Sequence, residues 1–252
     1  MKVLILNGSP KKKGGASHFF ANVFRLMLCG CITSYESLLS KNNYSRILEQ
    51  LRDIDALIIS APLYVDAMPS HVLEFLTLAE CYCKENDCRF TLYVISNNGF
   101  IEGIQNKVHL QMYQCWCERT SVKWGGGIGI GGGVMLHVLS IVYPIIFAVY
   151  ILNIVLNLIS GNEISGAMWL PLLQNVLIYL FLNSGMVYSM IRLSSHVRKK
   201  ENTKNRFTRA MIPSLLFILV ADIFMFLSSL FNGRFIFSLL KRDNYEDYYV
   251  KR

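Results

Sequence analysis

Three short segments of the sequence combine the residue types that hold a phosphate and a flat ring. They read G-S-P-K-K-K-G-G-A-S after residue 7, A-P-L-Y-V-D-A-M-P after residue 60, and N-N-G-F-I-E-G after residue 96. Each follows a short apolar run, so each is expected to leave the carboxyl end of a buried strand. Ligands of open parallel sheets bind at that edge, which makes these segments the first candidates for a shared site.

The first segment is suited to a single phosphate group. It opens a predicted helix, and backbone N–H groups at such a terminus form an anion site. Ser9 and Ser17 add hydroxyl donors, and Lys11 adds a positive charge. The patterns G-x-x-x-x-G-K-[ST] and G-x-G-x-x-G do not occur in it, which disfavours a nucleoside triphosphate or a dinucleotide. An ordinary solvated loop is the alternative for this segment taken alone.

The second and third segments are suited to a flat heteroaromatic ring. The second places apolar and aromatic side chains between two prolines, which stiffen it by fixing φ. The third offers two amides for polar contacts, a glycine for close approach and an aromatic ring. The residues concerned are Leu63, Tyr64, Val65, Asn97, Asn98, Gly99 and Phe100. Each segment alone also fits an ordinary turn, but three of them at successive strand ends favour a ligand site.

The first half of the chain has the pattern of a sheet that would bring these segments together. Predicted strands alternate with predicted helices whose apolar residues recur at helical spacing. The strands are 2–7, 31–38 (weak), 56–60, 90–96 and 122–133, and the helices are 17–28, 44–53, 70–82 and 104–118. This alternation predicts an α/β fold with a doubly wound, parallel, five-stranded sheet.

The second half of the chain has the composition of membrane-spanning helices. The segments 134–160, 167–191 and 210–231 contain one charged residue among them, Asp222. A span needs about 20 mainly apolar residues, so all three are long enough. We therefore expect a first domain over 1–133 and an all-α transmembrane region of about three helices over 134–252.

Most of the net charge of +8 comes from one short segment. Residues 192–209 carry seven basic residues and one acid between two apolar segments. A basic loop of this kind is typical of the cytoplasmic side of a membrane, and the absence of an interleaved aromatic platform disfavours a nucleic-acid partner. Three spans would place residues 1–133 and this loop on the cytoplasmic side of the cell membrane. The alternative is that 134–160 packs on the sheet and only the later two segments span.

The cysteines and histidines give no signature of a metal site or a catalytic triad. Six of the seven cysteines form three C-x-C pairs, whereas zinc and iron–sulfur sites usually show C-x-x-C spacing and further ligands. Residues i and i+2 of a helix point apart, so we expect structural thiols and no metal. His18, His71 and His109 are scattered along the sequence and are expected to be surface or packing residues.

The first half resembles the flavodoxin-like NAD(P)H-dependent FMN reductases and quinone reductases over about residues 1–133. The resemblance rests on I-L-N-G-S-P-K followed by Ser17, on P-L-Y-V-D-A-M-P, on N-N-G-F-I-E and on G-G-G-I-G-I-G-G-G. It implies that the first loop holds the phosphate of flavin mononucleotide (FMN) through Ser9, Lys11 and Ser17. It also implies a set of residues around the flavin ring: Pro62, Leu63, Tyr64, Val65, Asn97, Asn98, Gly99 and Phe100.

The resemblance further implies an oxidoreductase in which NADH or NADPH passes hydride to the flavin. The cofactor carries that chemistry, so no catalytic side chain is expected, and Tyr64 is the aromatic residue expected near the substrate. A quinone, a free flavin or another small molecule would accept the electrons, and relatives are often homodimers. Joined to the apolar half, this predicts a multi-pass, membrane-anchored enzyme in contact with lipid.

Two other functions stay open at this point. The chain could be a non-catalytic membrane protein whose flavodoxin-like domain senses redox state or binds a partner. It could also be part of a transporter or channel with a degenerate soluble domain, although three spans are few and Asp222 is the one charge within them. Reduction of bound FMN by NAD(P)H during steady turnover separates the enzyme from the first alternative.

Overall fold

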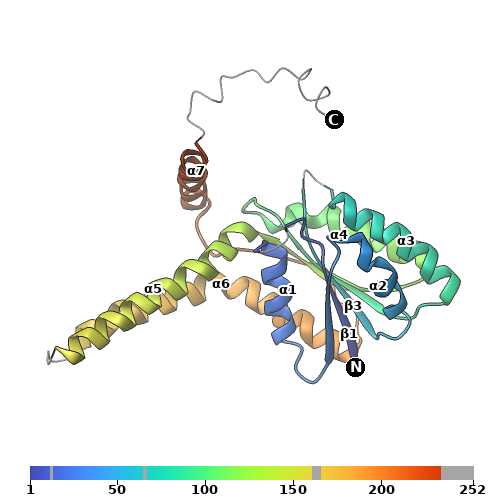
Figure 1. Ribbon diagram of the computed structural model, residues 1–252, viewed down its shortest axis with the longest axis horizontal. Coiled ribbons are helices and arrows are strands. Elements are labelled where there is room, and N and C mark those ends of the chain that lie inside the picture. Colours follow the sequence, from blue (N-terminus) through green and yellow to red (C-terminus); the bar gives the residue numbers. More distant parts are fainter. Residues whose placement is uncertain (12–13, 65–66, 161–165, 234–252) are drawn as a thin grey trace, which may run out of the picture. The chain divides into compact units, whose positions relative to one another are not determined.

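A computed structural model describes residues 1–11, 14–64, 67–160 and 166–233 of the chain (Figure 1). Strands and helices alternate up to β5, as the sequence predicts. The described strands are β1 (Lys2–Asn7), β2 (Ile32–Ser37), β3 (Ala56–Pro62), β4 (Thr91–Asn97), β5 (Lys123–Gly131) and β6 (Arg206–Arg209). The described helices are α1 (Ala16–Leu26), η1 (Lys41–Asn43), α2 (Tyr44–Gln50), α3 (Ser70–Asn86), η2 (Gly103–Asn106), α4 (Lys107–Thr120), α5 (Gly133–Ile159), α6 (Gly166–Lys199) and α7 (Ser214–Phe231).

The strands form one parallel sheet in the order β2-β1-β3-β4-β5-β6. The order 2-1-3-4-5 of the first five is that of the flavodoxin-like doubly wound fold, which confirms the predicted fold class. The prediction of five strands is wrong, because β6 adds a sixth beside β5. β6 comes from the segment 192–209, and its sequence R-F-T-R is too short and too polar to give a strand signal.

Helices cover both faces of the sheet (Figure 1). On one face α2, α3 and α4 pack over strand residues such as Leu4, Leu57 and Leu92, which are fully buried. On the other face lie α1 and the C-terminal half of α6. Because both faces of the central strands are covered, these strands read as continuous apolar runs and not as alternating ones.

The helices α5 and α6 form a hairpin. Along one face of α5, Tyr143, Phe147 and Tyr150 recur at helical spacing, and the ring of Tyr143 lies 4.8 Å from that of Tyr179 on α6. Asn175 of α6 approaches the Tyr150 hydroxyl with its amide nitrogen at 3.5 Å. An amide and aromatic seam between two apolar helices is the kind of contact that joins helices in a membrane.

The helix that covers the sheet beside α1 is α6. Its C-terminal half buries Met186, Met190, Leu193 and Val197, each at most 3% exposed, and these residues recur at helical spacing. Helix α5 contacts α1 near its start, but most of its large apolar side chains beyond that point are exposed. The alternative in which 134–160 is the last helix of the sheet therefore does not describe this chain.

Both helices of the hairpin meet the sheet at its carboxyl edge. Helix α5 follows β5 almost directly, and the amide of Gly133 donates to the carbonyl of Asn98 at 2.9 Å. On α6, a Cβ at Gly185 would lie 2.6 Å from the Thr208 hydroxyl, close to the end of β6. The exposed parts of α5 and α6 thus begin at the edge where the three predicted loops emerge.

The chain divides into two compact units, Met1–Met211 and Ile212–Arg252. The first unit continues well past residue 133, the domain boundary expected from the sequence, because the end of α6 and β6 belong to the sheet. The segment 192–209 is accordingly not a loop throughout, which corrects that prediction. The described part of the second unit is mainly α7, an apolar helix that begins after Pro213 and exposes Asp222.

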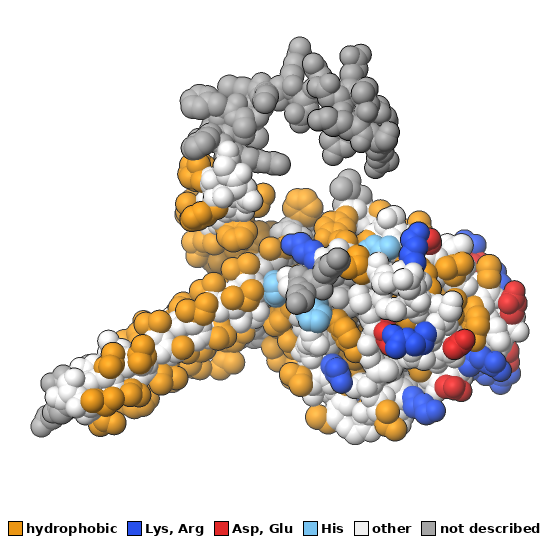
Figure 2. All heavy atoms as spheres, viewed as in Figure 1, with side chains coloured by type: hydrophobic (Ala, Val, Ile, Leu, Met, Phe, Trp, Pro, Cys, Tyr) orange, Lys and Arg blue, Asp and Glu red, His pale blue; other side chains and the backbone are white. Residues whose placement is uncertain are grey.

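Three described helices are long and apolar enough to cross a membrane: α5, α6 and α7. Their most apolar windows have mean hydropathies of 2.4, 1.5 and 2.3, and only 11%, 28% and 6% of the window residues are buried. Figure 2 shows hydrophobic side chains along the visible face of the hairpin, whereas most charged side chains gather over the sheet and its helices. Helix α6 extends beyond its predicted span, 167–191, because its last turns lie on the sheet.

Candidate functional site

The loop after β1 is held in a compact turn by side chains. The Asn7 side-chain oxygen accepts the Ser9 amide at 3.0 Å, and the Ser9 hydroxyl oxygen accepts the Lys11 amide at 3.3 Å. His71, at the start of α3, lies 3.1 Å from the Gly8 carbonyl oxygen, to which its Nε2–H donates. Asn at the end of a strand commonly closes a turn on its own backbone in this way. The sequence identified Ser9 and Lys11 as site residues. It did not identify Asn7 and His71 as the residues whose side chains hold this loop in place.

The start of α1 forms the second side of the pocket in which a phosphate is expected. Gly15 at its N-cap has no side chain, and the first amides of a helix have no intrahelical partner. Ser17 is buried at 1% exposure, and its hydroxyl accepts the Asn97 side-chain amide at 3.1 Å. The Ser60 hydroxyl fixes the turn by donating to the Ser17 carbonyl at 2.8 Å. Free amides and a buried hydroxyl at a helix N-terminus suit an anion.

The loops after β3 and β4 are tied to each other and to β5. The Leu63 amide donates to the Asn97 carbonyl at 2.7 Å, and the Asn98 amide donates to the Ile130 carbonyl at 3.0 Å. The Asn98 side-chain oxygen is buried, and among the described residues it has no hydrogen-bond partner. A buried acceptor without a donor is costly. It is therefore suited to a ligand N–H, such as one on the edge of a flavin ring.

One pocket at the carboxyl edge joins the three loops. Its lining residues are Ser9, Lys11, Gly15, Ala16, Ser17, Pro62, Leu63, Tyr64, Asn97, Asn98, Gly99 and Val134. The structure thus brings together nine of the eleven residues predicted for the site. Val65 lies outside the described residues, and Phe100, at 67% exposure, is not part of the lining.

The pocket is small, with a cavity volume of about 70 Å³. Sites that enclose a drug-sized molecule have about 300–1,000 Å³, so this cavity has room for a phosphate but not for a whole nucleotide. A flat ring would lie at its mouth, against the exposed side chain of Tyr64. Val134, in the first turn of α5, also lines the pocket. No sequence signal marked Val134, because its role depends on where α5 starts relative to β5.

Strand β6 contacts the loop that follows β4. Arg209 at its end forms an ion pair with Glu102. A Cβ on Gly103 would overlap the carbonyl oxygen of Thr208 and would come within 2.7 Å of the Gly129 carbonyl oxygen. The loop that carries Asn98 is therefore fitted between β5 and β6 with no room for a side chain at this position.

We expect the Gly103→Ala substitution to destabilise the sheet unit by about 2 kcal/mol, because overpacking against backbone atoms costs about 1–3 kcal/mol. Gly99→Ala is the matched control, since a Cβ at Gly99 meets nothing within 4 Å. Urea unfolding in detergent, followed by tryptophan fluorescence, measures both variants. Equal unfolding midpoints for the two variants would show that the loop accommodates the added methyl group at Gly103 without loss of stability.

Beneath the site, a buried polar network connects β4 to α4. The Ser96 hydroxyl donates to the Asn106 side-chain oxygen at 2.7 Å and lies 2.6 Å from His109 Nδ1. Asn106 in turn donates its amide to the Gly103 carbonyl at 3.0 Å. Burial lowers the pKa of His109 to about 4. His109 is therefore a neutral packing residue, as the sequence suggested, but it also supports the loop that bears Asn98.

The cysteines do not form a metal site in the described part of the chain, where no three potential ligands come together. Two of the C-x-C pairs lie on helices, and their members point apart: Cys81 and Cys115 are exposed, whereas Cys83 and Cys117 are buried. The buried Cys83 interacts with thiols outside its own C-x-C pair, namely Cys88 in the turn after α3 and Cys117 on α4.

No family model matches the chain, and no curated protein matches it. Among solved structures it is similar to the Trp repressor binding protein from Bacillus subtilis, with 17% identity over 52% of this chain and 84% of that chain (TM-score 0.40). It is similar to an NAD(P)H:quinone oxidoreductase from Methanothermobacter marburgensis, with 20% identity over 52% and 84% (TM-score 0.41). It is also similar to an NADPH-quinone reductase from P. pentosaceus, with 12% identity over 52% and 86% (TM-score 0.45).

These similarities are too low to carry an activity over to this chain. The strand order itself defines the class, a flavodoxin-like domain with its pocket at the carboxyl edge of a parallel sheet. The pocket and the hairpin that starts beside it are the features of this chain that bear on its function.

Proposed function

We propose that this chain is a membrane-anchored, FMN-dependent NAD(P)H oxidoreductase. The proposal is carried by the pocket at the carboxyl edge, where a phosphate cradle, an exposed aromatic ring and a buried free acceptor meet. The cradle has room for one phosphate, which favours a mononucleotide over a dinucleotide. The loops that meet there are those whose sequences resemble FMN reductases.

The residues present fit FMN. Ser9, Ser17 and the first amides of α1 would hold its phosphate, with Lys11 supplying positive charge. Tyr64 would lie along the ring, and the Asn98 side-chain oxygen would accept a ring N–H. When bound, FMN supplies the chemistry of accepting a hydride from NADH or NADPH and passing electrons on. The protein's part is to orient the two rings, and no acid–base side chain is needed.

The hairpin supports anchoring in a membrane. Beyond the sheet, the visible face of α5 and α6 is covered by hydrophobic side chains (Figure 2). The basic residues of 192–209 lie at the end of α6, in the connection that follows it and on β6. They therefore stay on the sheet's side of the proposed membrane, which agrees with a cytoplasmic flavin domain. We propose a small electron acceptor, a quinone or a free flavin, for this multi-pass protein, which would contact lipid, form a homodimer and have no nucleic-acid partner.

The first test is the visible absorption spectrum of the full chain purified in mild detergent. We expect a band near about 450 nm, the region of oxidised flavin, which NADH or NADPH bleaches under anaerobic conditions. Steady turnover with a quinone would then establish the enzyme. A flavin that binds but is not reduced would favour the redox-sensing alternative. A colourless protein that takes up no FMN would contradict both.

The membrane topology has its own test. The variants Ser160→Cys and Ser195→Cys, each in a background without native cysteines, are labelled in intact cells with a membrane-impermeant maleimide. We expect labelling at Ser160, between α5 and α6, and none at Ser195 until the cells are lysed. Labelling at both positions would contradict a cytoplasmic sheet unit, and labelling at neither would contradict a span by α5.

A further inference from the structure

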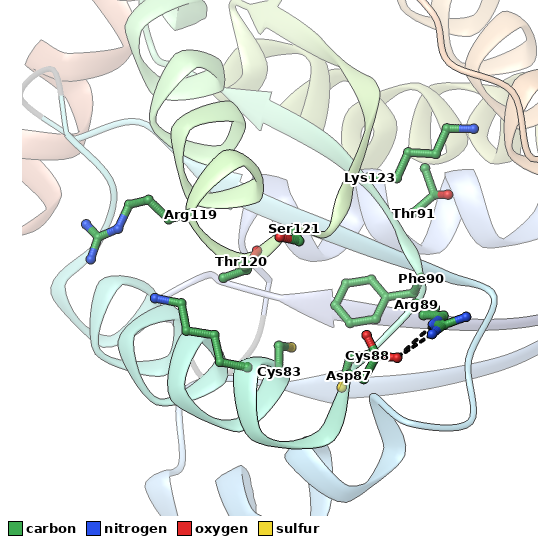
Figure 3. Close-up of a pocket in the computed structure, with 11 residues that line it drawn as sticks. Cys83, Asp87, Cys88, Arg89, Phe90, Thr91, Arg119, Thr120, Ser121 and Lys123 are labelled. Atoms are coloured by element: carbon green, nitrogen blue, oxygen red, sulfur yellow. Dashed lines mark hydrogen bonds and ion pairs between the residues drawn. The ribbon is translucent and has the colours of Figure 1, made fainter.

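A second, larger cavity lies at the opposite edge of the sheet (Figure 3). It has a volume of about 620 Å³ and lies between the C-terminal ends of α3 and α4 and the first residues of β4 and β5. Its lining includes two thiols, Cys83 and Cys88, and several basic side chains. Because it opens at the amino edge, it plays no part in the flavin pocket.

The backbone brings the two cysteines together. Helix α3 ends in a left-handed residue, Asp87 (φ 46°), and the amide of Cys88 donates to the carbonyl of Cys83 at 3.3 Å. This is the hydrogen bond of a Schellman turn, in which the residues at the two ends of the bond also touch through their side chains. In this chain both of those side chains carry a thiol, and the interaction between them contributes to the raised pKa of Cys83.

We propose that Cys83 and Cys88 form a reversible disulfide in response to a peroxide that enters this cavity. The six-residue turn holds the two Cα atoms near each other across one backbone hydrogen bond, which suits the short span of a disulfide. Both thiols are nearly buried, at 2% and 7% exposure, yet both line the cavity. A small oxidant such as a peroxide can reach both thiols through the cavity.

The peroxide is the oxidant that accepts the two electrons lost by the two thiols. The Cys88 thiolate attacks one peroxide oxygen, the O–O bond breaks, and the departing oxygen leaves as water after taking up a proton. Cys83 then attacks the resulting sulfenic acid, so that an S–S bond forms, the S–O bond breaks and a second water leaves. Two thiols lose two electrons and two protons in total, and the peroxide is reduced to two waters.

Cys88 is the better first nucleophile of the pair. Burial raises the pKa of both thiols. For Cys88 the hydrogen bond with Cys83 and the positive charge of Arg52 lower the pKa, whereas the Asp87 carboxylate raises it. For Cys83 no positive side chain of the described residues offsets the effect of burial on the pKa, and the thiols of Cys88 and Cys117 raise this pKa further. Cys83 therefore acts as the resolving thiol, and the pair is expected to react more slowly than an exposed cysteine.

The sequence offers a sharp readout, because trypsin cuts after Lys84 and after Arg89. Cys88 is then the one cysteine in the peptide 85–89, whereas Cys83 lies in the peptide 53–84 together with Cys81. The full chain in detergent is treated with hydrogen peroxide, its remaining thiols are alkylated, and it is digested without reduction. We expect the two peptides to be found linked, with the loss of two hydrogens, and to separate on reduction.

Two serine variants identify the partner of Cys88. The link is expected to persist in Cys81→Ser, whose exposed side chain lies outside the cavity lining, and to vanish in Cys83→Ser. Persistence of this link in Cys83→Ser would make Cys81 the partner of Cys88, and a link from 85–89 to the peptide 108–119 would make the partner Cys115 or Cys117. Either result would overturn the assignment. Wild-type chain in which Cys88 stays alkylatable while the exposed Cys115 is oxidised would show that the pair is only the apolar contact of a helix cap.

Discussion

The Ser17→Asp variant is expected to bind FMN about a thousandfold more weakly than the wild-type chain. Ser17 is buried in the first turn of α1 and lines the pocket proposed for the phosphate. A carboxylate at this position would occupy the anion site and repel a phosphate, and like charges brought together cost several kcal/mol. A cost of about 4 kcal/mol corresponds to a factor of about a thousand in affinity. Quenching of FMN fluorescence during titration measures it.

The matched control is Ser17→Ala, which removes one hydrogen bond without adding charge. It is expected to weaken FMN binding by about tenfold, the effect of losing roughly 1–1.5 kcal/mol. Aspartate is favourable in the first turn of a helix, so the Ser17→Asp chain should keep the circular dichroism spectrum of the wild type. A folded Ser17→Asp chain that binds FMN within a few-fold of wild type would place the phosphate elsewhere.

Acidification is expected to destabilise the sheet unit through His109, by about 3 kcal/mol between pH 6.5 and pH 4. Burial lowers the pKa of His109 from 6.5 to about 4, so the folded protein holds this ring neutral over that range. The unfolded chain, with a pKa near its ordinary value, takes up a proton already below pH 6.5. Because the unfolded state then binds more protons, stability falls as pH falls, at about 1.36 kcal/mol for each unit of pKa difference.

The His109→Gln variant tests this assignment. Glutamine can keep a hydrogen bond to Ser96 but cannot titrate, so the variant should lose most of the dependence between pH 6.5 and pH 4. Burial also lowers the pKa of His71, so a smaller slope of the same sign should remain. Urea unfolding at a series of pH values gives both curves. Parallel curves for the two proteins would show that His109 is not the group responsible.

The sequence predicted the sheet up to β5 because a buried parallel strand leaves a local signature. The runs K-V-L-I-L-N, A-L-I-I-S and F-T-L-Y-V-I-S are apolar and end in turn residues, so strand and loop are both readable. Strand β6 has no such signature. Its four residues become a strand only because β5 offers a free edge beside them, and pairing across such a separation in sequence cannot be read from local composition.

The same distinction applies to the pocket. Ser9, Ser17, Tyr64 and Asn98 could be predicted because parallel strands place their carboxyl ends at one edge. His71, which holds the Gly8 carbonyl, was assigned only to packing, because its contact joins two elements. Phe100 was predicted to lie along the ring, and it is exposed outside the lining of the pocket. Its carbonyl accepts the Gly132 amide, and this turns the loop after Gly99 toward β5.

The position of β6 has a consequence for how the chain folds. β5 and β6 are neighbours in the sheet, yet the whole of α5 and α6 lies between them in the sequence. The sheet cannot be completed until both helices have been synthesised and have turned back. A long unstructured connection would make the pairing of β6 with β5 entropically unfavourable. Because α5 and α6 pair as a hairpin, α6 returns to β5, the strand that α5 follows. Formation of the hairpin is therefore expected to precede docking of β6, and late docking would leave Glu102 without its Arg209 partner until the last step of folding.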